Sequence, residues 1–342
     1  MKALRIAVLG SYGKTTMKDM LETVLSRGKK VVATPGNTNV LISHARWLLD
    51  DVKGDEEILI FEYGEAEPGD IGRLARFSQP ESAVITGMAP AHMDGYGTLD
   101  AIGKDFATIY KVAHPESVFF NAESPELASR ISQGVEYSSQ GVDGWNISAI
   151  VVTLNGVSFE MKKAKRHLKL RSGLLGKHNV GPLAAVVAMA ARIGLTDSQI
   201  TQGVAATKPF EHRLQPYKLG GADIIDDTYN GNLEGMKAGL ELLASLPAKR
   251  KSFVTPGLVE QGLDNEVIHQ QLGEYIAKAS PDKVVLMKNS NTQAIRAGLE
   301  KQNYSGDVQE EDDPLDFYTN LQHIVAAGDL VLLQNDWTDN YR

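Results

Sequence analysis

A seven-residue run near the N-terminus constrains the fold of this chain more than any other feature. Gly10-Ser11-Tyr12-Gly13-Lys14-Thr15-Thr16 follows a short apolar stretch, Ile6 to Leu9, and opens a helical pattern. Glycines between a strand and a helix direct backbone N–H groups and the positive end of the helix dipole toward an anion. The lysine adds a charge and the threonine a ligand for Mg²⁺. The run therefore predicts a phosphate-binding loop, in a shorter form of the usual pattern because Val8 replaces its first glycine.

Strand-like runs alternate with helical patterns along most of the chain. In the first part, strands are expected near 4–9, 30–34, 57–62, 82–87 and 117–121, with helices near 14–27, 40–50, 70–77 and 98–112. This alternation is typical of βαβ units and predicts an α/β fold with an open, doubly wound, mostly parallel sheet. Three short runs, near 145–152, 156–161 and 167–170, predict a small antiparallel flank, with Asn155-Gly156 as a hairpin turn.

The same alternation begins again in the C-terminal part. Helices near 177–193 and 196–205 come first, and Lys208-Pro209 follows them. Further strands are expected near 222–226, 251–255, 283–287 and 329–334, with helices near 231–245, 264–279, 291–302 and 314–326. A chain of 342 residues is long enough for two cores. We therefore predict two domains, residues 1–211 with the phosphate loop and residues 212–342 as a smaller Rossmann-like α/β domain.

Composition and charge exclude several classes of function. The chain has 35 basic and 43 acidic side chains, a net charge of −8, so we expect no nucleic-acid partner. It has no cysteine, which excludes disulfides, thiolate zinc sites and iron–sulfur clusters. No stretch approaches the ~20 apolar residues of a membrane-spanning helix. We therefore expect a cytoplasmic protein without membrane insertion.

Polar side chains follow the other predicted strands of the first sheet. The segment Thr34 to Asn39 follows the second strand, Glu62 ends the third, and His92 follows the fourth. Ligands bind at the carboxyl ends of the strands in an open α/β sheet. We therefore expect the phosphate loop, Asn39, Glu62 and His92 to meet in one cleft.

In their order and spacing these motifs resemble the Mur ligase family, and most of all its D-Ala-D-Ala-adding type. Further matching segments are Asn121-Ala122-Glu123, Gly176 to Val180, Arg213, Asp226 to Asn232, Glu260-Gln261-Gly262 and His269. The resemblance implies that ATP phosphorylates a carboxylate and that an amine then attacks the acyl phosphate, giving an amide in cell-wall or related peptide precursor synthesis. Phosphoryl transfer of this kind depends on positioning and charge neutralisation and needs no covalent protein nucleophile.

The resemblance also implies roles for individual residues. The catalytic residues would be Lys14, Glu62, His92 and Arg213. ATP would be bound by Gly10, Ser11, Tyr12, Gly13, Lys14, Thr15, Thr16, Asn179, Arg213 and Asp227. Mg²⁺ would be held by Thr15, Glu62 and His92. The carboxylate and amine substrates would contact Asn37, Asn39, Tyr229, Asn230 and Asn232.

Several positions depart from the family pattern. Phe106 stands where many relatives have a carbamylated lysine, and Pro182 replaces the second asparagine of the segment after Gly176. Gln334-Asn335-Asp336 stands in place of a Lys-Gly-Ser run. The chain also begins on its first strand, so we expect the N-terminal domain that holds the uridine nucleotide sugar to be lacking.

These departures leave more than one function open. The chain could act alone as an amide ligase whose two substrates the sequence does not identify. Alternatively, it is a Mur-like ATPase subunit that needs a partner protein to supply substrate or ammonia. A nucleotide-dependent regulator that forms no amide bond is a third reading.

Overall fold

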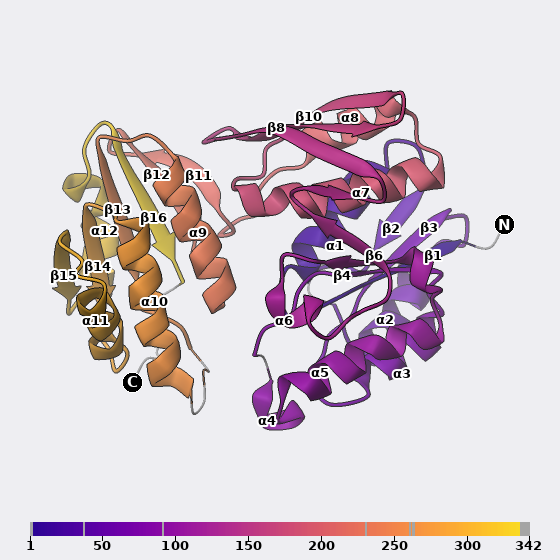
Figure 1. Cartoon of the computed structure of the whole chain (residues 1–342), viewed down its shortest axis with the longest axis horizontal. Coiled ribbons are helices and arrows are strands. Elements are labelled where there is room, and N and C mark those ends of the chain that lie inside the picture. Colours follow the sequence, from indigo (N-terminus) through magenta and orange to yellow (C-terminus); the bar gives the residue numbers. More distant parts are fainter. Residues whose placement is uncertain are drawn as a thin grey trace. The chain divides into compact units, whose positions relative to one another are not determined.

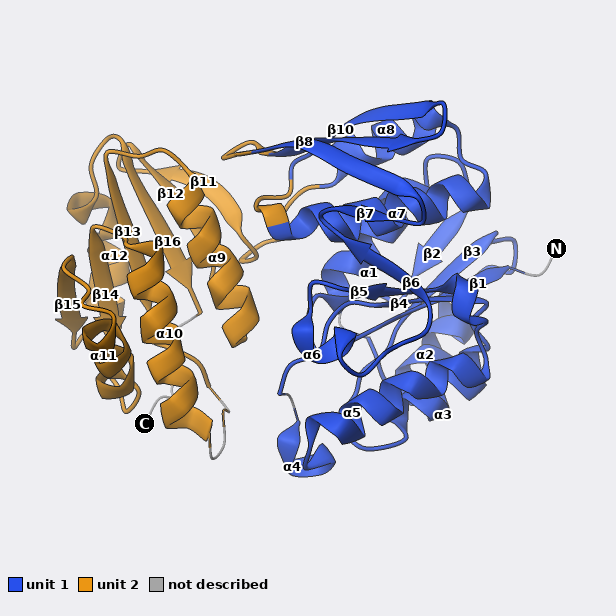
Figure 2. Cartoon of the chain, viewed as in Figure 1, with its two compact units in different colours: residues 1–151, 157–173, 178–207 blue, residues 152–156, 174–177, 208–342 orange. Residues whose placement is uncertain are grey.

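The computed structural model of the chain describes residues 3–36, 38–90, 92–229, 231–259, 261 and 264–335 (Figure 1). The chain divides into two compact units, each with its own sheet (Figure 2). Unit 1 comprises residues 1–151, 157–173 and 178–207, and unit 2 comprises residues 152–156, 174–177 and 208–342.

Unit 1 is built on a ten-stranded sheet with the order β10-β9-β8-β7-β6-β5-β4-β1-β3-β2. Its strands are β1 (Leu4–Leu9), β2 (Val31–Ala33), β3 (Ile58–Glu62), β4 (Ser82–Ile85), β5 (Val118–Asn121), β6 (Val135–Ser138), β7 (Gly141–Val142), β8 (Trp145–Thr153), β9 (Gly156–Lys163) and β10 (Arg166–Ser172). Strand β1 pairs in parallel with β3 on one side and with β4 on the other. The strand order therefore reverses at β1, and such a switch point is where open α/β sheets bind ligands.

The helices of unit 1 cover both faces of this sheet. They are α1 (Lys14–Leu25), α2 (Leu41–Asp50), α3 (Asp70–Ser78), α4 (Met93–Tyr96), α5 (Leu99–Phe106), α6 (Pro125–Ala128), α7 (Val180–Ile193) and α8 (Asp197–Ala206). Helix α7 is apolar and buried along most of its length, as expected of a helix enclosed on all sides. Pro182 lies in its first turn, where no backbone N–H is needed.

Unit 2 has a six-stranded sheet with the order β11-β12-β16-β13-β14-β15. Its strands are β11 (Gln215–Leu219), β12 (Ala222–Asp227), β13 (Arg250–Thr255), β14 (Lys283–Met287), β15 (Asp307–Glu311) and β16 (Asp329–Gln334). Its helices are α9 (Leu233–Ser245), α10 (Asn265–Ala279), α11 (Thr292–Lys301) and α12 (Pro314–Ile324). Leu240, Ile276 and Ile295 of α9, α10 and α11 share one core cluster with the sheet, and Phe317 of α12 belongs to another.

The observed architecture is the predicted one, with a parallel sheet, an antiparallel extension and a second α/β sheet. The prediction missed four strands, and two of them, β11 and β15, lie at the edges of the second sheet. Edge strands carry proline and charged residues, such as Pro216 and Asp307, instead of a continuous apolar run. The other two, β6 and β7, are only four and two residues long.

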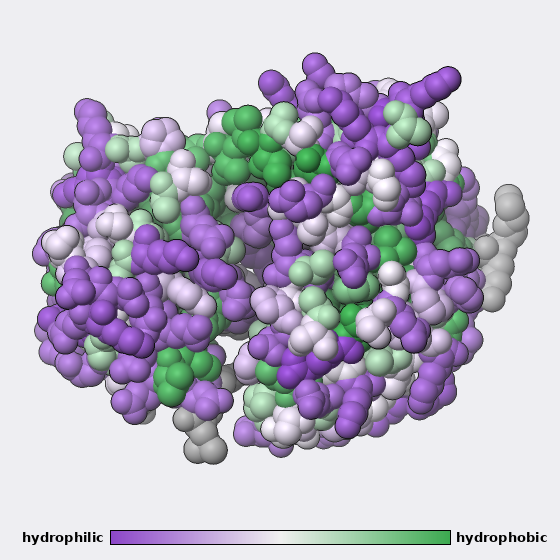
Figure 3. All heavy atoms as spheres, viewed as in Figure 1, coloured by the Kyte–Doolittle hydropathy of each residue, from purple (hydrophilic) through white to green (hydrophobic). Residues whose placement is uncertain are grey.

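The surface agrees with the polar composition of the chain. On the face drawn in Figure 3, hydrophilic side chains predominate, and hydrophobic ones form small separate patches. Across the part of the chain that the structure describes, no helix combines the length and the apolar character needed to cross a membrane.

Candidate functional site

The predicted phosphate loop joins the end of β1 to the start of α1. Gly10 has a φ of 140° and Gly13 a φ of 75°, values that glycine adopts without a steric penalty. A Cβ atom at position 10 would lie only 2.3 Å from Oγ1 of Thr86. The Thr86 hydroxyl donates to the carbonyl of Tyr12, and the Ser11 N–H donates to the Gly87 carbonyl at 2.9 Å. The loop is therefore held close against the residues that follow β4, and only glycine fits at its start.

The start of α1 has the properties of an anion site. Its N-cap residue, Gly13, provides no capping side chain, and the first turn contains no acidic residue. The Ser11 hydroxyl is buried and finds no hydrogen-bond partner among the described residues. A phosphate would satisfy the free N–H groups and the hydroxyl, and the helix dipole would favour its charge.

Lys14 forms an ion pair that the sequence analysis missed. Its ammonium nitrogen lies 2.8 Å from Oε2 of Glu65 and 3.1 Å from Oε1, and it donates to the Gly10 carbonyl at 2.5 Å. The Glu65 side chain is only 2% exposed. Burial raises the pKa of Glu65, and the Lys14 charge opposes that increase. The only signal in the sequence was the position of Glu65, three residues after Glu62 at the same edge of the sheet.

Glu62 also lies beside the phosphate loop and has two partners on α1. The Thr15 hydroxyl donates to its Oε1 at 3.2 Å, and the Lys18 ammonium lies 3.1 Å from Oε2. The side chains of Lys18 and Glu62 are each 2% exposed. Lys18 was missed as well, although it follows Lys14 by one helical turn and therefore lies on the same face of α1.

The donor set at Glu62 fits Mg²⁺. A threonine hydroxyl and a carboxylate are hard oxygen ligands, which Mg²⁺ prefers. Oε2 of Glu62 is buried and accepts no hydrogen bond of good geometry from the described residues. In those same residues, no three His, Asp or Glu side chains lie close enough together to hold a metal ion. Mg²⁺ at Glu62 would therefore take most of its ligands from phosphate or water.

His92 stands at the N-terminus of the short helix α4, where it is exposed and has a φ of 50°. It lies close enough to Glu65 for the two groups to interact electrostatically. Phe106, at the position where the resemblance implies a carbamylated lysine, is fully buried in the core with Ile102 and Ile109. The chain therefore has an aromatic core residue where the resemblance implies a ligand for a second metal ion.

Asn39 adjoins the same edge of the sheet. Its carbonyl accepts a hydrogen bond from the Gly64 N–H at 2.7 Å, and a Cβ atom on Gly64 would lie 2.9 Å from Cγ of Asn39. Asn37, the other predicted substrate contact in this segment, lies outside the described residues. The structure thus brings Asn39, Glu62 and the phosphate loop to the ends of neighbouring strands, with His92 linked to them through Glu65.

Asn179 immediately precedes α7 and is 6% exposed. Its side-chain amide nitrogen lies 3.1 Å from Nε2 of His178, which accepts the hydrogen bond. Helices α1 and α7 pack against each other. Contact between Asn179 and an adenine base stays a prediction.

In unit 2, Arg213 stacks on an aromatic ring. Its guanidinium carbon lies 4.3 Å from the centre of the Tyr229 ring, a cation–π arrangement. The flanking residues, His212 and Leu214, have φ values of 59° and 47°. Two non-glycine residues in left-handed conformation strain the backbone on both sides of Arg213.

Asp227 stabilises this strained segment from the end of β12. It accepts hydrogen bonds from the Leu214 N–H at 3.1 Å and from Nε2 of Gln334 at 2.8 Å. Burial raises the pKa of Asp227 to about 6, and the nearby Arg213 charge opposes this. Asn232 caps α9, because its Oδ1 accepts from the Gly235 N–H at 2.8 Å. Asn230 lies outside the described residues.

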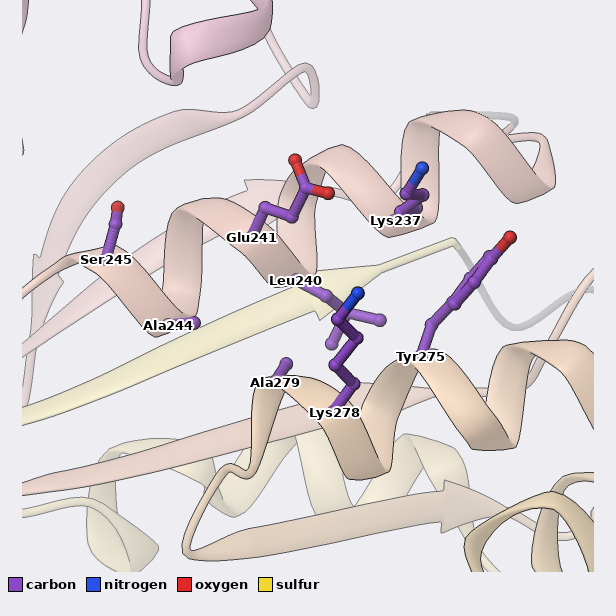
Figure 4. A pocket seen from close by; sticks show the side chains of 8 residues that line it. All are labelled: Lys237, Leu240, Glu241, Ala244, Ser245, Tyr275, Lys278 and Ala279. Carbon is purple, nitrogen blue, oxygen red and sulfur yellow. The ribbon is translucent and has the colours of Figure 1, made fainter. Parts of the chain in front are cut away.

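A separate cavity of about 400 Å³ lies between α9 and α10. Figure 4 shows Lys237 and Glu241 on α9 and Tyr275 and Lys278 on α10 around it. The Lys237 ammonium is 5.7 Å from the centre of the Tyr275 ring. None of the residues predicted to bind ATP or substrate lines this cavity.

Comparison with known proteins supports one assignment. The sequence model of the Mur ligase middle domain matches residues 8–190, and that of the "Mur ligase, glutamate ligase domain" matches residues 212–334. The chain is 32% identical to the "UDP-N-acetylmuramoyl-tripeptide--D-alanyl-D-alanine ligase" of Synechocystis sp. over 317 residues, which are 88% of this chain and 66% of that protein. It is 28% identical to the Escherichia coli protein of the same name over 305 residues, 86% of this chain and 67% of that protein.

A solved structure shares the fold. The MurF ligase of Thermotoga maritima, crystallised in complex with ADP, is similar with a TM-score of 0.84 and 25% identity, over 98% of this chain and 77% of that one. These matches confirm the predicted family resemblance, the two-sheet α/β fold and the ligase class. The chain spans about two thirds of the length of the curated relatives it matches. Because the middle-domain sequence model alone matches more than half of its 342 residues, the chain belongs to the Mur ligase family.

Proposed function

We propose that this chain forms an amide bond between a carboxylate and an amine, with ATP as the source of energy and an acyl phosphate as the intermediate. The observation that carries this proposal is the arrangement of Lys14, Thr15 and Glu62 beside a clamped glycine loop at the switch point of the sheet. A relative of the same fold binds ADP, which supports a nucleotide at this loop.

The residues of unit 1 have distinct tasks in this reaction. The N–H groups at the start of α1 hold phosphate oxygens, and Lys14 neutralises their charge. Thr15 and Glu62 would hold Mg²⁺, which would further neutralise the phosphate charge. Lys18 fixes the Glu62 carboxylate through the ion pair at 3.1 Å. These groups position the γ-phosphate and stabilise its charge, which is what phosphoryl transfer requires of the protein.

The other predicted residues extend this proposal. Asn179, Arg213 and Asp227 would complete the nucleotide site, and His92 would contact a second metal ion or the acyl phosphate. Asn39, Tyr229 and Asn232 would contact the substrates. In this scheme residues 1–211 form the ATP-binding domain and residues 212–342 the C-terminal domain.

The names of the relatives support a proposal for the two substrates. Two of them are UDP-N-acetylmuramoyl-tripeptide--D-alanyl-D-alanine ligases. We assign the dipeptide D-alanyl-D-alanine as the amine and a muramoyl peptide as the carboxylate, in peptidoglycan precursor synthesis in the cytoplasm.

Phosphate release tests this function directly. The purified chain is incubated with ATP, Mg²⁺, a muramoyl tripeptide with or without its uridine nucleotide, and D-alanyl-D-alanine, and the amide product is identified by mass spectrometry. Phosphate and product are expected only when both substrates are present. Lys14→Met is expected to abolish both, whereas Lys104→Met, at an exposed lysine of α5, leaves them unchanged. Phosphate release that is the same with and without the amine contradicts a ligase, and activity that appears only with an added protein favours the ATPase-subunit alternative.

A further inference from the structure

The charged side chains around the phosphate loop pair with one another. Lys14 pairs with Glu65 at 2.8 Å, and Lys18 lies 3.1 Å from Glu62. Two ammonium groups therefore face two carboxylates. Three of these four side chains are 2% exposed, and Lys14, at 15%, is the most accessible.

A nucleotide phosphate must compete with Glu65 for Lys14. The ammonium has three donors, and among the described residues it donates to Glu65 and to the Gly10 carbonyl. When Lys14 turns to a phosphate, the buried Glu65 carboxylate loses its ion pair and keeps the weaker electrostatic interaction with His92. Removing one partner of a buried ion pair is strongly unfavourable, because the remaining charge is neither paired nor hydrated.

Glu62 does not lose its ion-pair partner in this way. Its partner, Lys18, also donates to the Gly36 carbonyl and is buried on α1. Glu62 therefore keeps its countercharge when a phosphate binds at the loop, whereas Glu65 loses its own. Of these two carboxylates, Glu65 alone sets the electrostatic cost of recruiting Lys14.

We propose that Glu65 is a positioning residue that competes with the nucleotide phosphates for Lys14 and makes nucleotide binding depend on a divalent cation. This inference rests on the proposed ATP site. Without a divalent cation, the phosphates and Glu65 place uncompensated negative charge around one ammonium. With the cation present, the added positive charge reduces the repulsion between the phosphates and Glu65.

The experiment measures the affinity for ADP by isothermal titration calorimetry, once in EDTA and once in Mg²⁺. Wild type is compared with Glu65→Gln, which keeps the shape of the side chain and removes its charge. Glu67→Gln is the matched control, because Glu67 lies in the same loop but is exposed. In EDTA, Glu65→Gln is expected to bind ADP at least about tenfold more tightly than wild type, because the coupling free energies measured between close charge pairs are of this size or larger. In Mg²⁺ the gain in ADP affinity is expected to be smaller. The ratio of the ADP affinity in Mg²⁺ to that in EDTA is therefore smaller for Glu65→Gln than for wild type.

Several outcomes would overturn the inference. An unchanged or weaker affinity of Glu65→Gln in EDTA shows that Glu65 does not compete for Lys14. An equal gain in ADP affinity for Glu67→Gln shows that any loss of negative charge from this loop strengthens ADP binding. Wild type that binds no ADP in either buffer removes the nucleotide site itself, and this inference with it.

A folding control and a second variant separate the effect of the Glu65 charge from a folding defect. Thermal unfolding followed by circular dichroism first establishes that each variant is folded. Glu65→Asp keeps the charge but shortens the side chain by one methylene, which weakens the contact with Lys14. It is expected to bind ADP in EDTA with an affinity between those of wild type and Glu65→Gln, and an affinity no greater than that of wild type counts against the proposal.

Discussion

Replacing Asp227 by asparagine tests the electrostatics at the end of β12. The Asp227 carboxylate accepts hydrogen bonds from Leu214 and Gln334, and burial raises its pKa to about 6 from an ordinary 3.8. Between these two values the folded state holds a proton that the unfolded chain has already released. The free energy of unfolding therefore falls as the pH rises from about 4 to about 6.

The size of this effect follows from the two pKa values. Their difference corresponds to about 3 kcal/mol, and solvent screening at this partly exposed position reduces it to about 1–2 kcal/mol. Asparagine carries no charge and keeps an acceptor for the Leu214 N–H. Its amide nitrogen replaces the oxygen that accepts from Nε2 of Gln334. If the Gln334 amide turns over, its Oε1, which is buried and has no hydrogen-bond partner among the described residues, accepts from this nitrogen. Asp227→Asn is therefore expected to be more stable than wild type by about 1–2 kcal/mol above pH 6 and to lose this advantage near pH 4.

Hydrogen exchange followed by mass spectrometry measures this difference in unit 2 alone. Opening free energies are compared for peptides from β12 and β16 at several values between pH 4.5 and pH 8, after correction for the intrinsic exchange rate. Asp223→Asn is the matched control, because Asp223 lies on the same strand and pairs with Lys218 at the surface. The reasoning is refuted when the difference in opening free energy between Asp227→Asn and wild type does not grow with pH. It is also refuted when wild type is the more stable of the two above pH 6.

Three further substitutions test separate parts of the fold. Gly10→Ala is expected to lower the free energy of unfolding of unit 1 by about 2–4 kcal/mol, because the methyl group meets Thr86 and the backbone is strained; thermal unfolding measures this loss. Phe106→Lys is expected to cost at least about 3 kcal/mol in urea unfolding, because it places a charge in the core, so a stable variant contradicts the core role of Phe106. Tyr229→Leu removes the stacking on Arg213, worth about 0.5–1 kcal/mol at an exposed site. Trypsin is then expected to cleave after Arg213 several times faster, and an unchanged rate argues against that stacking.

The parallel core of both sheets could be predicted because its strands are buried on both faces. Such strands consist of nearly continuous apolar runs, as in Ile58 to Phe61 and Leu330 to Leu333. The antiparallel extension was predicted as a flank, but its continuity with the main sheet was not. That continuity depends on β6 and β7, which are too short to show any periodicity.

The phosphate loop and Glu62 could be predicted because local sequence and strand order decide where they lie. Glu65 and Lys18 could not, because no motif marks them. The ion pairs of Glu65 with Lys14 and of Lys18 with Glu62 depend on which side chains are buried together where β3 ends and α1 begins, and this is a property of packing. The resemblance to the Mur ligases predicted residues for a ligand site but not the charged side chains that pair with them.

Gln334 departs from the family pattern, and the structure shows how this departure affects the pKa of Asp227. The resemblance implies a lysine at its position, and the Gln334 Nε2 atom lies 2.8 Å from the Asp227 carboxylate. A lysine ammonium would offset the cost of burying that charge, whereas a neutral amide supplies only a hydrogen bond. The Arg213 guanidinium, which stacks on Tyr229, interacts favourably with this carboxylate. Desolvation therefore outweighs the favourable interactions, and the pKa of Asp227 rises instead of falling.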